Sequence, residues 1–220
     1  MITKDQEKRM VGMVRKLLIG REETAGGVGY RYFHSMRVYR TARALLDSKE
    51  VRSKKADRDA VLVAALFHDI GRAGFKSIEP NVPGHDEKSA AFIRKNLSRM
   101  VGADLANRAA DLMDDYADRG KSYLEKDILM SADTLDKFGA LGVWRSFVYG
   151  AYKKLNVKDR LDYHRRYEGR KWENELLGLL RVKVAKRLAR RRLKVARDFM
   201  RELRTEYEGK DVIRLAKGRR

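Results

Sequence analysis

Cysteine is absent from this sequence of 220 residues, and proline occurs only twice. Without cysteine the chain has neither disulfides nor thiolate ligands, so any bound metal has to be held by His, Asp or Glu. No run of eighteen apolar residues occurs, and the first residues, MITKDQEKRM, lack the apolar core of a signal peptide. We therefore expect a cytoplasmic protein with no membrane-spanning helix.

Basic residues outnumber acidic ones, with 51 Lys and Arg against 31 Asp and Glu and a formal net charge of +20. The segment 181–220 alone holds 16 basic and 5 acidic residues, which is +11 of that total. A surface this positive attracts phosphate groups, whether they belong to nucleotides, nucleic acids or anionic lipids. The hydrophobic content of 43% indicates a folded chain and not a disordered one.

The scarcity of proline, together with apolar residues at helical spacing, predicts an all-α chain. Loops are expected at 20–30 and 71–84, where Gly and Pro interrupt any regular element. We expect helices at about 3–18, 31–47, 57–68, 86–97, 103–118, 124–138 and 172–206.

No repeat, low-complexity linker or domain boundary is visible, so we expect a single helical domain over residues 1–220. Its core should span about 25–150. Helices at about 155–206 should pack on that core, the last of them long and basic, and a basic tail should follow at 207–220.

Two histidines and two aspartates stand at apolar positions of three predicted helices. His34 shares a helical face with Val38, His68 and Asp69 end the apolar run 61–67, and Asp133 lies among apolar neighbours. Taken singly, each has a structural interpretation: a core histidine with one hydrogen bond, an Asp–His pair capping a helix, or an acid paired with a cation. Burying any of them without a partner costs several kcal/mol.

One divalent cation would satisfy all four groups at once. Two imidazoles and two carboxylates from three helices form a suitable ligand shell. Nitrogen and oxygen ligands without sulfur suit Mn²⁺, Mg²⁺, Fe²⁺, Co²⁺, Ni²⁺ or Zn²⁺ and do not distinguish between them. Such an ion acidifies a bound water and polarises a phosphoryl oxygen.

The four residues lie in segments that resemble the motifs of the HD superfamily of metal-dependent phosphohydrolases. The spaced pattern H…HD…D falls on His34, His68–Asp69 and Asp133, and the likeness extends from about residue 25 to 206. The segments are FHSMRV, LVAALFHDIG, GHDEKSA and ILMSADTLDKFGALGVWRSF. The resemblance implies an all-α HD-type bundle and hydrolysis of a phosphoester or phosphoanhydride. It favours a nucleotide as the phosphorylated small-molecule substrate.

The sequence departs from the family pattern at three places. Ser131 stands where Asp is usual and Thr134 where Arg is usual. A histidine expected in the preceding helix is missing, and Asp114, Asp115 and Tyr116 stand there instead. That histidine, with His85, would complete a second metal site in two-metal relatives, so its absence favours a single ion.

Other residues receive roles as hypotheses. Asp69 could also orient the attacking water, and His85 could transfer a proton or contact phosphate, although it could equally be an exposed loop histidine. His164 has no motif context and is expected at the surface or in a loop. Asp114 and Asp115 are either a surface pair or a substitute ligand. The candidates for substrate contact, any of which could instead be solvated or packing residues, are Arg37, Arg72, Lys76, Lys88, Asp136 and Arg145.

Two other functional classes remain open. The basic C-terminal helix could bind a nucleic acid backbone, although aromatic residues are not interleaved with its cations. Alternatively, the changes at Ser131 and Thr134 could leave an HD protein that binds a metal or ligand without turnover. The sequence does not indicate an oligomeric state.

Overall fold

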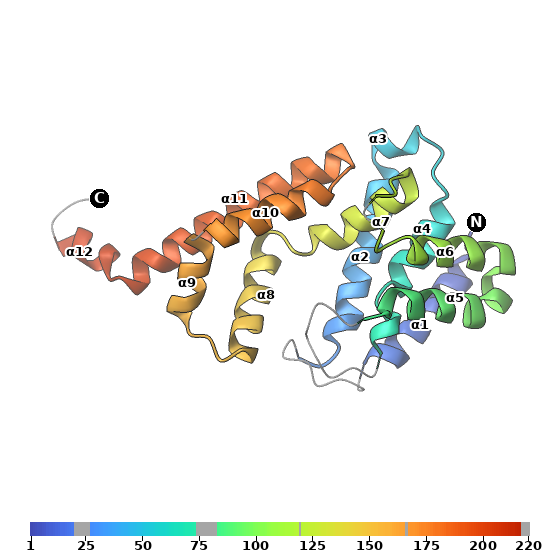
Figure 1. Cartoon of the computed structure of the whole chain (residues 1–220), viewed down its shortest axis with the longest axis horizontal. Coiled ribbons are helices and arrows are strands. Elements are labelled where there is room, and N and C mark those ends of the chain that lie inside the picture. The colour runs from blue at the N-terminus through green and yellow to red at the C-terminus, as the bar shows by residue number, and fades with distance from the viewer. Residues whose placement is uncertain (20–26, 74–82, 119, 166, 217–220) are drawn as a thin grey trace.

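The computed structural model describes residues 1–19, 27–73, 83–118, 120–165 and 167–216, and every regular element in them is helical (Figure 1). The prediction of an all-α bundle is therefore confirmed. The elements are α1 (Lys4–Leu18), α2 (Tyr30–Asp47), α3 (Lys49–Arg52), α4 (Arg58–Phe67), the 3₁₀ turn η1 (Ile70–Arg72), α5 (His85–Val101), α6 (Ala103–Asp114), α7 (Leu124–Leu135), α8 (Gly139–Tyr152), α9 (Val157–Arg165), α10 (Tyr167–Leu179), α11 (Lys183–Tyr207) and α12 (Lys210–Ala216).

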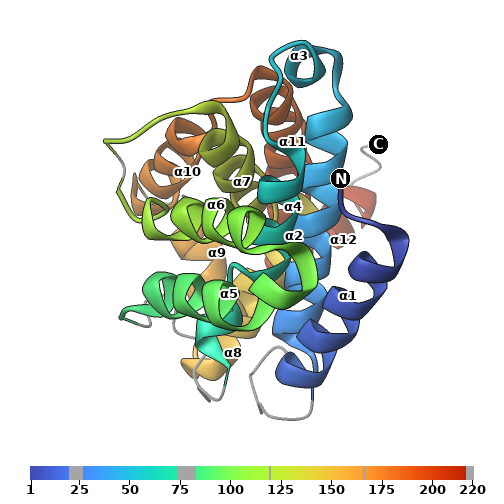
Figure 2. The ribbon, with the colours of Figure 1, turned by 90° about the vertical axis from the view of Figure 1, so that its right-hand side faces the viewer.

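Helix α4 is the centre of the main core. Its residues 60–67 are all buried, and it contacts α2, α6 and α7. A helix that is apolar on every side can only be stable inside a protein. Asp57 caps its first turn by accepting a hydrogen bond from the Ala60 amide at 3.1 Å. Figure 2 shows α4 between α2 and α6, so the C-terminal end of α4 lies in the interior of the bundle.

The helices that follow residue 138 extend away from this core (Figure 1). A small second cluster of buried residues joins three of them: Val143 of α8, Leu161 of α9 and Met200 of α11. The single-domain organisation stays a prediction. None of the described helices has the length and apolar content needed to cross a membrane.

The long helix predicted at 172–206 is in fact two helices. It breaks between Leu179 and Lys183, because Leu180 and Val182 turn into the main core. The carboxylate of Glu50 accepts hydrogen bonds from the backbone amides of Lys183 and Val184, both at 2.9 Å, which caps the new helix start. Three smaller differences from the predicted helices accompany this break. Helix α6 ends at Asp114 and not at 118, α8 was not predicted, and the tail contains α12.

His164 was expected at the surface or in a loop, but it lies in α9 and is partly buried. Its Nε2 atom is 3.2 Å from the hydroxyl of Ser146 on α8. Burial, and then the nearby charge of Arg160, lower the pKa of the imidazole to about 4. The imidazole of His164 is therefore neutral where it lies between α8 and α9.

This lowered pKa predicts a loss of stability in acid. Between pH 6.5 and pH 4 the unfolded chain takes up a proton on His164 that the folded chain does not, so the free energy of unfolding should fall as the pH is lowered through this window. Urea unfolding followed by circular dichroism at pH 7, 5.5 and 4 measures this. His164→Gln keeps a polar group near Ser146 but does not titrate, so it should lose less stability than the wild type. An equal loss in both proteins would contradict the assignment.

Candidate metal centre

Three helices bring the predicted histidines and aspartates together. Helix α2 carries His34, the end of α4 carries His68 and Asp69, and α7 carries Asp133. The Nε2 atom of His34 lies 3.1 Å from Nε2 of His68 and 3.2 Å from Oδ1 of Asp133. The two carboxylate oxygens of Asp69 lie 3.8 Å from these same nitrogens, one from each ring. No side chain of the four is more than 14% exposed.

The hydrogen bonds of the two Nδ1 nitrogens determine the tautomers of His34 and His68. His34 Nδ1 is 2.8 Å from a carboxylate oxygen of Asp136, and His68 Nδ1 is 2.9 Å from the carbonyl oxygen of Ala65. A carboxylate and a carbonyl can only accept, so both Nδ1 atoms carry the proton. In the neutral rings both Nε2 atoms then present lone pairs to each other. The donor set of His34, His68 and Asp133 fits a metal ion, because lone pairs and carboxylate oxygens converge on one point.

The titration behaviour of the two rings agrees with this arrangement. Burial disfavours a charge on His34, but its hydrogen bonds to Asp133 and Asp136 outweigh burial and raise its pKa. Burial lowers the pKa of His68. The surrounding carboxylates therefore favour positive charge between the rings. A single shared proton would bridge the two nitrogens only and would leave the oxygens of Asp69 and Asp133 unliganded.

Asp133 is held by two donors on the oxygen that faces away from the histidines. The Lys137 ammonium and the Tyr116 hydroxyl each donate to Oδ2 at 2.9 Å, while Oδ1 faces His34. Burial would raise the pKa of Asp133, but the charge of Lys137 and the bond to His34 bring it well below its usual range. Burial and the neighbouring Asp133 raise the pKa of Tyr116, so its hydroxyl keeps the proton it donates.

Arg72 links Asp69 to His85. Its Nε donates to Asp69 Oδ1 at 2.7 Å, and one terminal nitrogen is 2.8 Å from His85 Nε2 at the start of α5. Burial alone would raise the pKa of Asp69, but the charges of His68 and Arg72 outweigh it and the pKa is lowered. Two predicted residues, Arg72 and His85, thus border the cluster on the side of Asp69.

Asp136 borders the cluster on the side of His34. Arg37 donates to both of its oxygens, at 2.6 and 3.0 Å, and Arg145 donates to Oδ2 at 3.1 Å. Burial opposes ionisation of Asp136, but its bonds to His34 and Arg37 lower its pKa. Two predicted substrate-contacting residues, Arg37 and Arg145, are therefore engaged with a carboxylate that orients His34.

The turn after His68 explains why glycine follows at position 71. A Cβ atom on Gly71 would lie 2.1 Å from the backbone oxygen of His85. Ser89 of α5 closes the same contact, because its hydroxyl donates to the His68 carbonyl at 2.8 Å and accepts from the Gly71 amide at 2.9 Å. The segment His85–Ser89 is thereby packed against the turn that carries Asp69.

The remaining candidates fall into three groups. Lys76 lies outside the described residues, and Lys88 lies on α5 beside Gly71. Asp114 is paired with Arg94, and Asp115 contacts Lys121 and Tyr123, so both have partners outside the cluster. Ser131 and Thr134 are at most 1% exposed.

Sequence reasoning gave no role to Tyr116 and overlooked Lys137 and Arg31. Lys137 follows Asp133 by four residues, a spacing that places both on one helical face and could have revealed it. Arg31 donates to the carbonyl of Arg72 across two elements, and Tyr116 reaches Asp133 from beyond the end of α6. No local spacing signals either contact.

Comparison with known proteins identifies the domain. The HD domain family matches residues 31–137, a range that includes His34, His68, Asp69 and Asp133. A search of curated proteins gives no match.

Solved structures share the fold over nearly the whole chain. Bacillus subtilis YpgQ is 20% identical, with a TM-score of 0.66 over 92% of this chain and 95% of YpgQ. YpgQ in complex with ADP has a TM-score of 0.66 at 20% identity, covering 94% of this chain and 97% of that one. An HD-superfamily hydrolase from Bacillus thuringiensis has a TM-score of 0.64 at 20% identity, covering 94% of this chain and 99% of that one. Residues 31–137 therefore match the HD domain family, and the structures that share the fold of nearly the whole chain include an HD-superfamily hydrolase.

Proposed function

We propose that this protein is a metal-dependent phosphohydrolase that cleaves a phosphoester or phosphoanhydride bond of a nucleotide. The observation that carries the proposal is the convergence of two imidazole lone pairs and the carboxylate oxygens of Asp69 and Asp133 in a buried site. The ADP complex of YpgQ, a protein of the same fold, supports a nucleotide as the substrate.

Four residues would hold the ion: His34 and His68 through Nε2, Asp133 through Oδ1, and Asp69 through a carboxylate oxygen. When bound, a divalent ion supplies an acidified water and polarises a phosphoryl oxygen. Asp69 would also accept a hydrogen bond from the attacking water, since its second oxygen is held by Arg72. One metal ion accounts for this donor set, and its identity is left to experiment.

The charges around the cluster favour a phosphate. Four cations surround three carboxylates, since Arg37 and Arg145 pair with Asp136, Arg72 with Asp69 and Lys137 with Asp133. A divalent ion added to this set leaves a positive site, which a substrate phosphate would neutralise. Arg72 and His85 are 13% and 18% exposed and would be the first groups to meet it. Arg37 and Arg145, 27% and 28% exposed, would contact it from the opposite side.

The nucleic-acid alternative is less well supported. Residues 176–197 hold nine basic and no acidic residues, which would attract a polyanion. In the second half of α11, however, Lys194, Arg197 and Arg201 each pair with a carboxylate of this chain. Binding to random duplex DNA that weakens steeply with salt would favour this alternative. The third possibility, an HD protein that binds a metal or ligand without turnover, predicts that no phosphate is released under any condition.

Loss of a histidine ligand should abolish turnover. His68→Ala removes one of the two facing nitrogens, so release of phosphate or pyrophosphate should fall by roughly a hundredfold or more. The assay screens nucleotides with Mn²⁺, Mg²⁺, Co²⁺ and Ni²⁺ in turn, and pyrophosphate release indicates α–β cleavage. His164→Gln is the matched control, because this histidine lies outside the cluster. Wild-type turnover that survives in His68→Ala, or is equally lost in the control, would refute the proposal.

Removing the Tyr116 hydroxyl should weaken metal binding without unfolding the chain. In Tyr116→Phe the Oδ2 atom of Asp133 loses one of its two donors, so the affinity for Mn²⁺ should fall about tenfold. Titration calorimetry measures this directly. Tyr123→Phe removes a hydroxyl that contacts Asp115 at the surface, and it should bind Mn²⁺ as the wild type does. Equal affinities in all three proteins would show that Tyr116 does not position the ligand.

A further inference from the structure

One face of α11 has no partner within the described chain. We call it the α11 stripe; it recurs at intervals of three and four residues and comprises Leu188, Arg191, Val195, Phe199, Glu202 and Glu206. Leu188 is 36% exposed, Val195 51% and Phe199 50%. The buried residues of the same helix are Ala185, Ala189, Leu193 and Met200. This spacing is typical of a helix face that packs against another helix.

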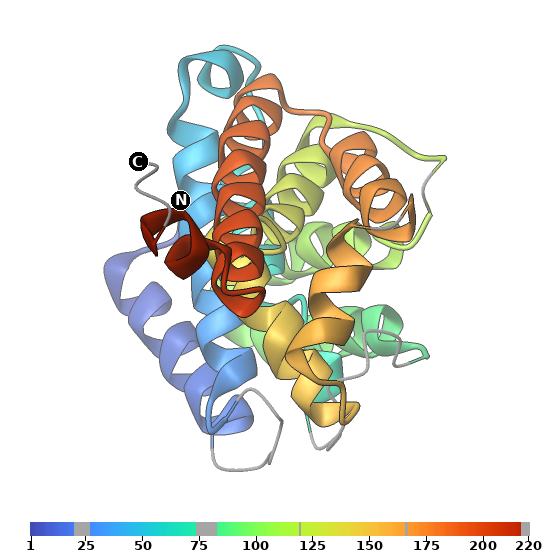
Figure 3. The ribbon, with the colours of Figure 1, turned by 90° about the vertical axis from the view of Figure 1, so that its left-hand side faces the viewer.

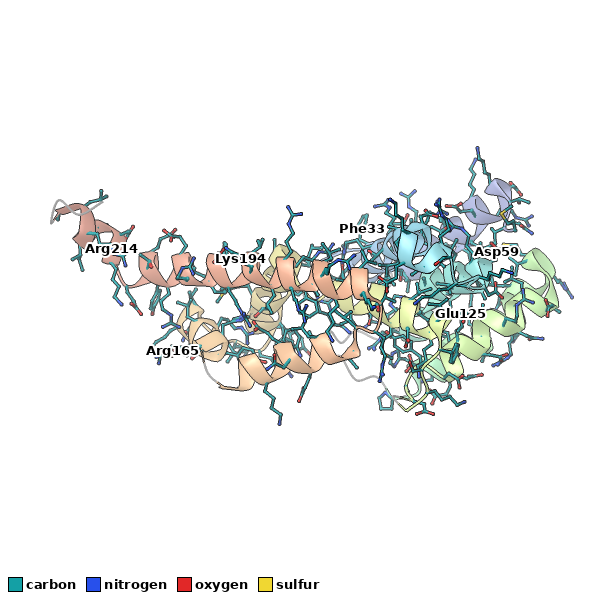
Figure 4. The ribbon with its side chains drawn as sticks, turned by 90° about the horizontal axis from the view of Figure 1, so that it is seen from above. Phe33, Asp59, Glu125, Arg165, Lys194 and Arg214 are labelled. Carbon is teal, nitrogen blue, oxygen red and sulfur yellow. The ribbon has the colours of Figure 1, made fainter. Side chains whose placement is uncertain are left out.

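The helix itself is accessible. Figure 3 shows α11 in front, with no other element crossing it along its length apart from α12 at its end, and Figure 4 shows its C-terminal half extending away from the body of the protein. A second helix could therefore lie alongside α11 without displacing the bundle.

The charged residues on and beside the α11 stripe differ in sign between its two halves. Lys183, Arg187 and Arg191 lie in the N-terminal half, and Glu202 and Glu206 lie in the C-terminal half. Among the described residues, none of these five side chains forms an ion pair. Like charges spaced by four residues repel along a helix, so each of these two groups would gain from a counter-charge supplied by a partner.

The two halves cannot neutralise each other within one chain. Arg187 and Glu202 are fifteen residues apart, which is about 22 Å along a helix. If a second α11 runs antiparallel with Val195 opposite Val195, residues equally far from position 195 meet. Arg187 then lies within one residue of opposing Glu202 of the second copy, and Lys183 within one residue of opposing Glu206. Arg191 lies opposite the exposed ring of Phe199.

We propose that the protein forms a two-fold symmetric dimer in which the α11 stripe packs antiparallel against the α11 stripe of a second copy, with Val195 on the axis. An isologous interface has to be self-complementary, and a stripe with cations at one end, acids at the other and apolar residues between them meets that condition. A single pair of helices gives an interface at the small end of the specific range, so the dimer should be reversible.

Other occupants fit the α11 stripe less well. A nucleic acid or an anionic membrane would match its basic half, but its phosphates would be repelled by Glu202 and Glu206. A second copy satisfies both halves at once, which is why we favour it.

Site-specific cross-linking tests the register. The chain has no cysteine, so Val195→Cys places a single thiol on the proposed axis. Mild oxidation or a short bismaleimide should cross-link it to a dimer. Leu188→Cys is the matched control, because its thiol would lie about 21 Å from its symmetry mate and should not cross-link. Equal cross-linking of the two variants, or of neither, would overturn the proposed register.

Charge exchange tests the pairing in solution. Sedimentation velocity should show a dimer for the wild type at about 100 µM and a dissociation constant raised at least tenfold in Glu202→Arg. The double variant Arg187→Glu with Glu202→Arg should restore the dimer. Both side chains are exposed, so circular dichroism should show an unchanged fold. A wild type that stays monomeric, a double variant as weak as the single one, or a monomer that binds duplex DNA or anionic vesicles through this face would reject the dimer.

Discussion

The geometry of the candidate site depends on two protons, one on the Nδ1 atom of each histidine ring. Asp136 and the carbonyl of Ala65 hold the Nδ1 hydrogens of His34 and His68, so the Nε2 lone pairs point at each other across 3.1 Å. Two lone pairs at that distance are unfavourable unless a cation lies between them. The arrangement is maintained because the rings belong to helices that the core holds in place. Stability of the bundle and affinity for a cation are therefore coupled through the packing of α2 against α4.

A ring of ion pairs keeps the carboxylates ready for this cation. Asp133 and Asp136 are buried and Asp69 is partly buried, and each lies among groups that lower its pKa in spite of the desolvation that opposes ionisation. In Asp69 and Asp133 one oxygen is bound by a cationic side chain while the other faces the cluster, whereas cations bind both oxygens of Asp136, which also accepts from His34. The basic residues nearest the site thus orient the carboxylates of the candidate metal centre.

Local periodicity explains which parts of this structure could be predicted. The apolar run 61–67 with Asp57 before it predicts α4 and its cap, and the motifs around His34, His68 and Asp133 predict the cluster that forms. The break at residues 180–182 was missed because Leu180 and Val182 continue an apolar helical pattern, and only the core decides that they turn inward. Tyr116 and Arg31 were missed for the same reason, since their partners are distant in sequence.

The positive charge has a structural use that composition does not reveal. Arg192 donates to the carbonyl of Leu135, the last residue of α7, at 2.7 Å, and Arg204 donates to the carbonyl of Leu161 at 2.5 Å. Lys126, 1% exposed, donates to the carbonyl of Lys121 at 2.9 Å. The last carbonyls of a helix have no intrahelical partner, and a long cationic side chain can donate to them, as Arg192 does at the end of α7. Part of the basic surplus therefore holds the helices together, and only the remaining cations are available to phosphate.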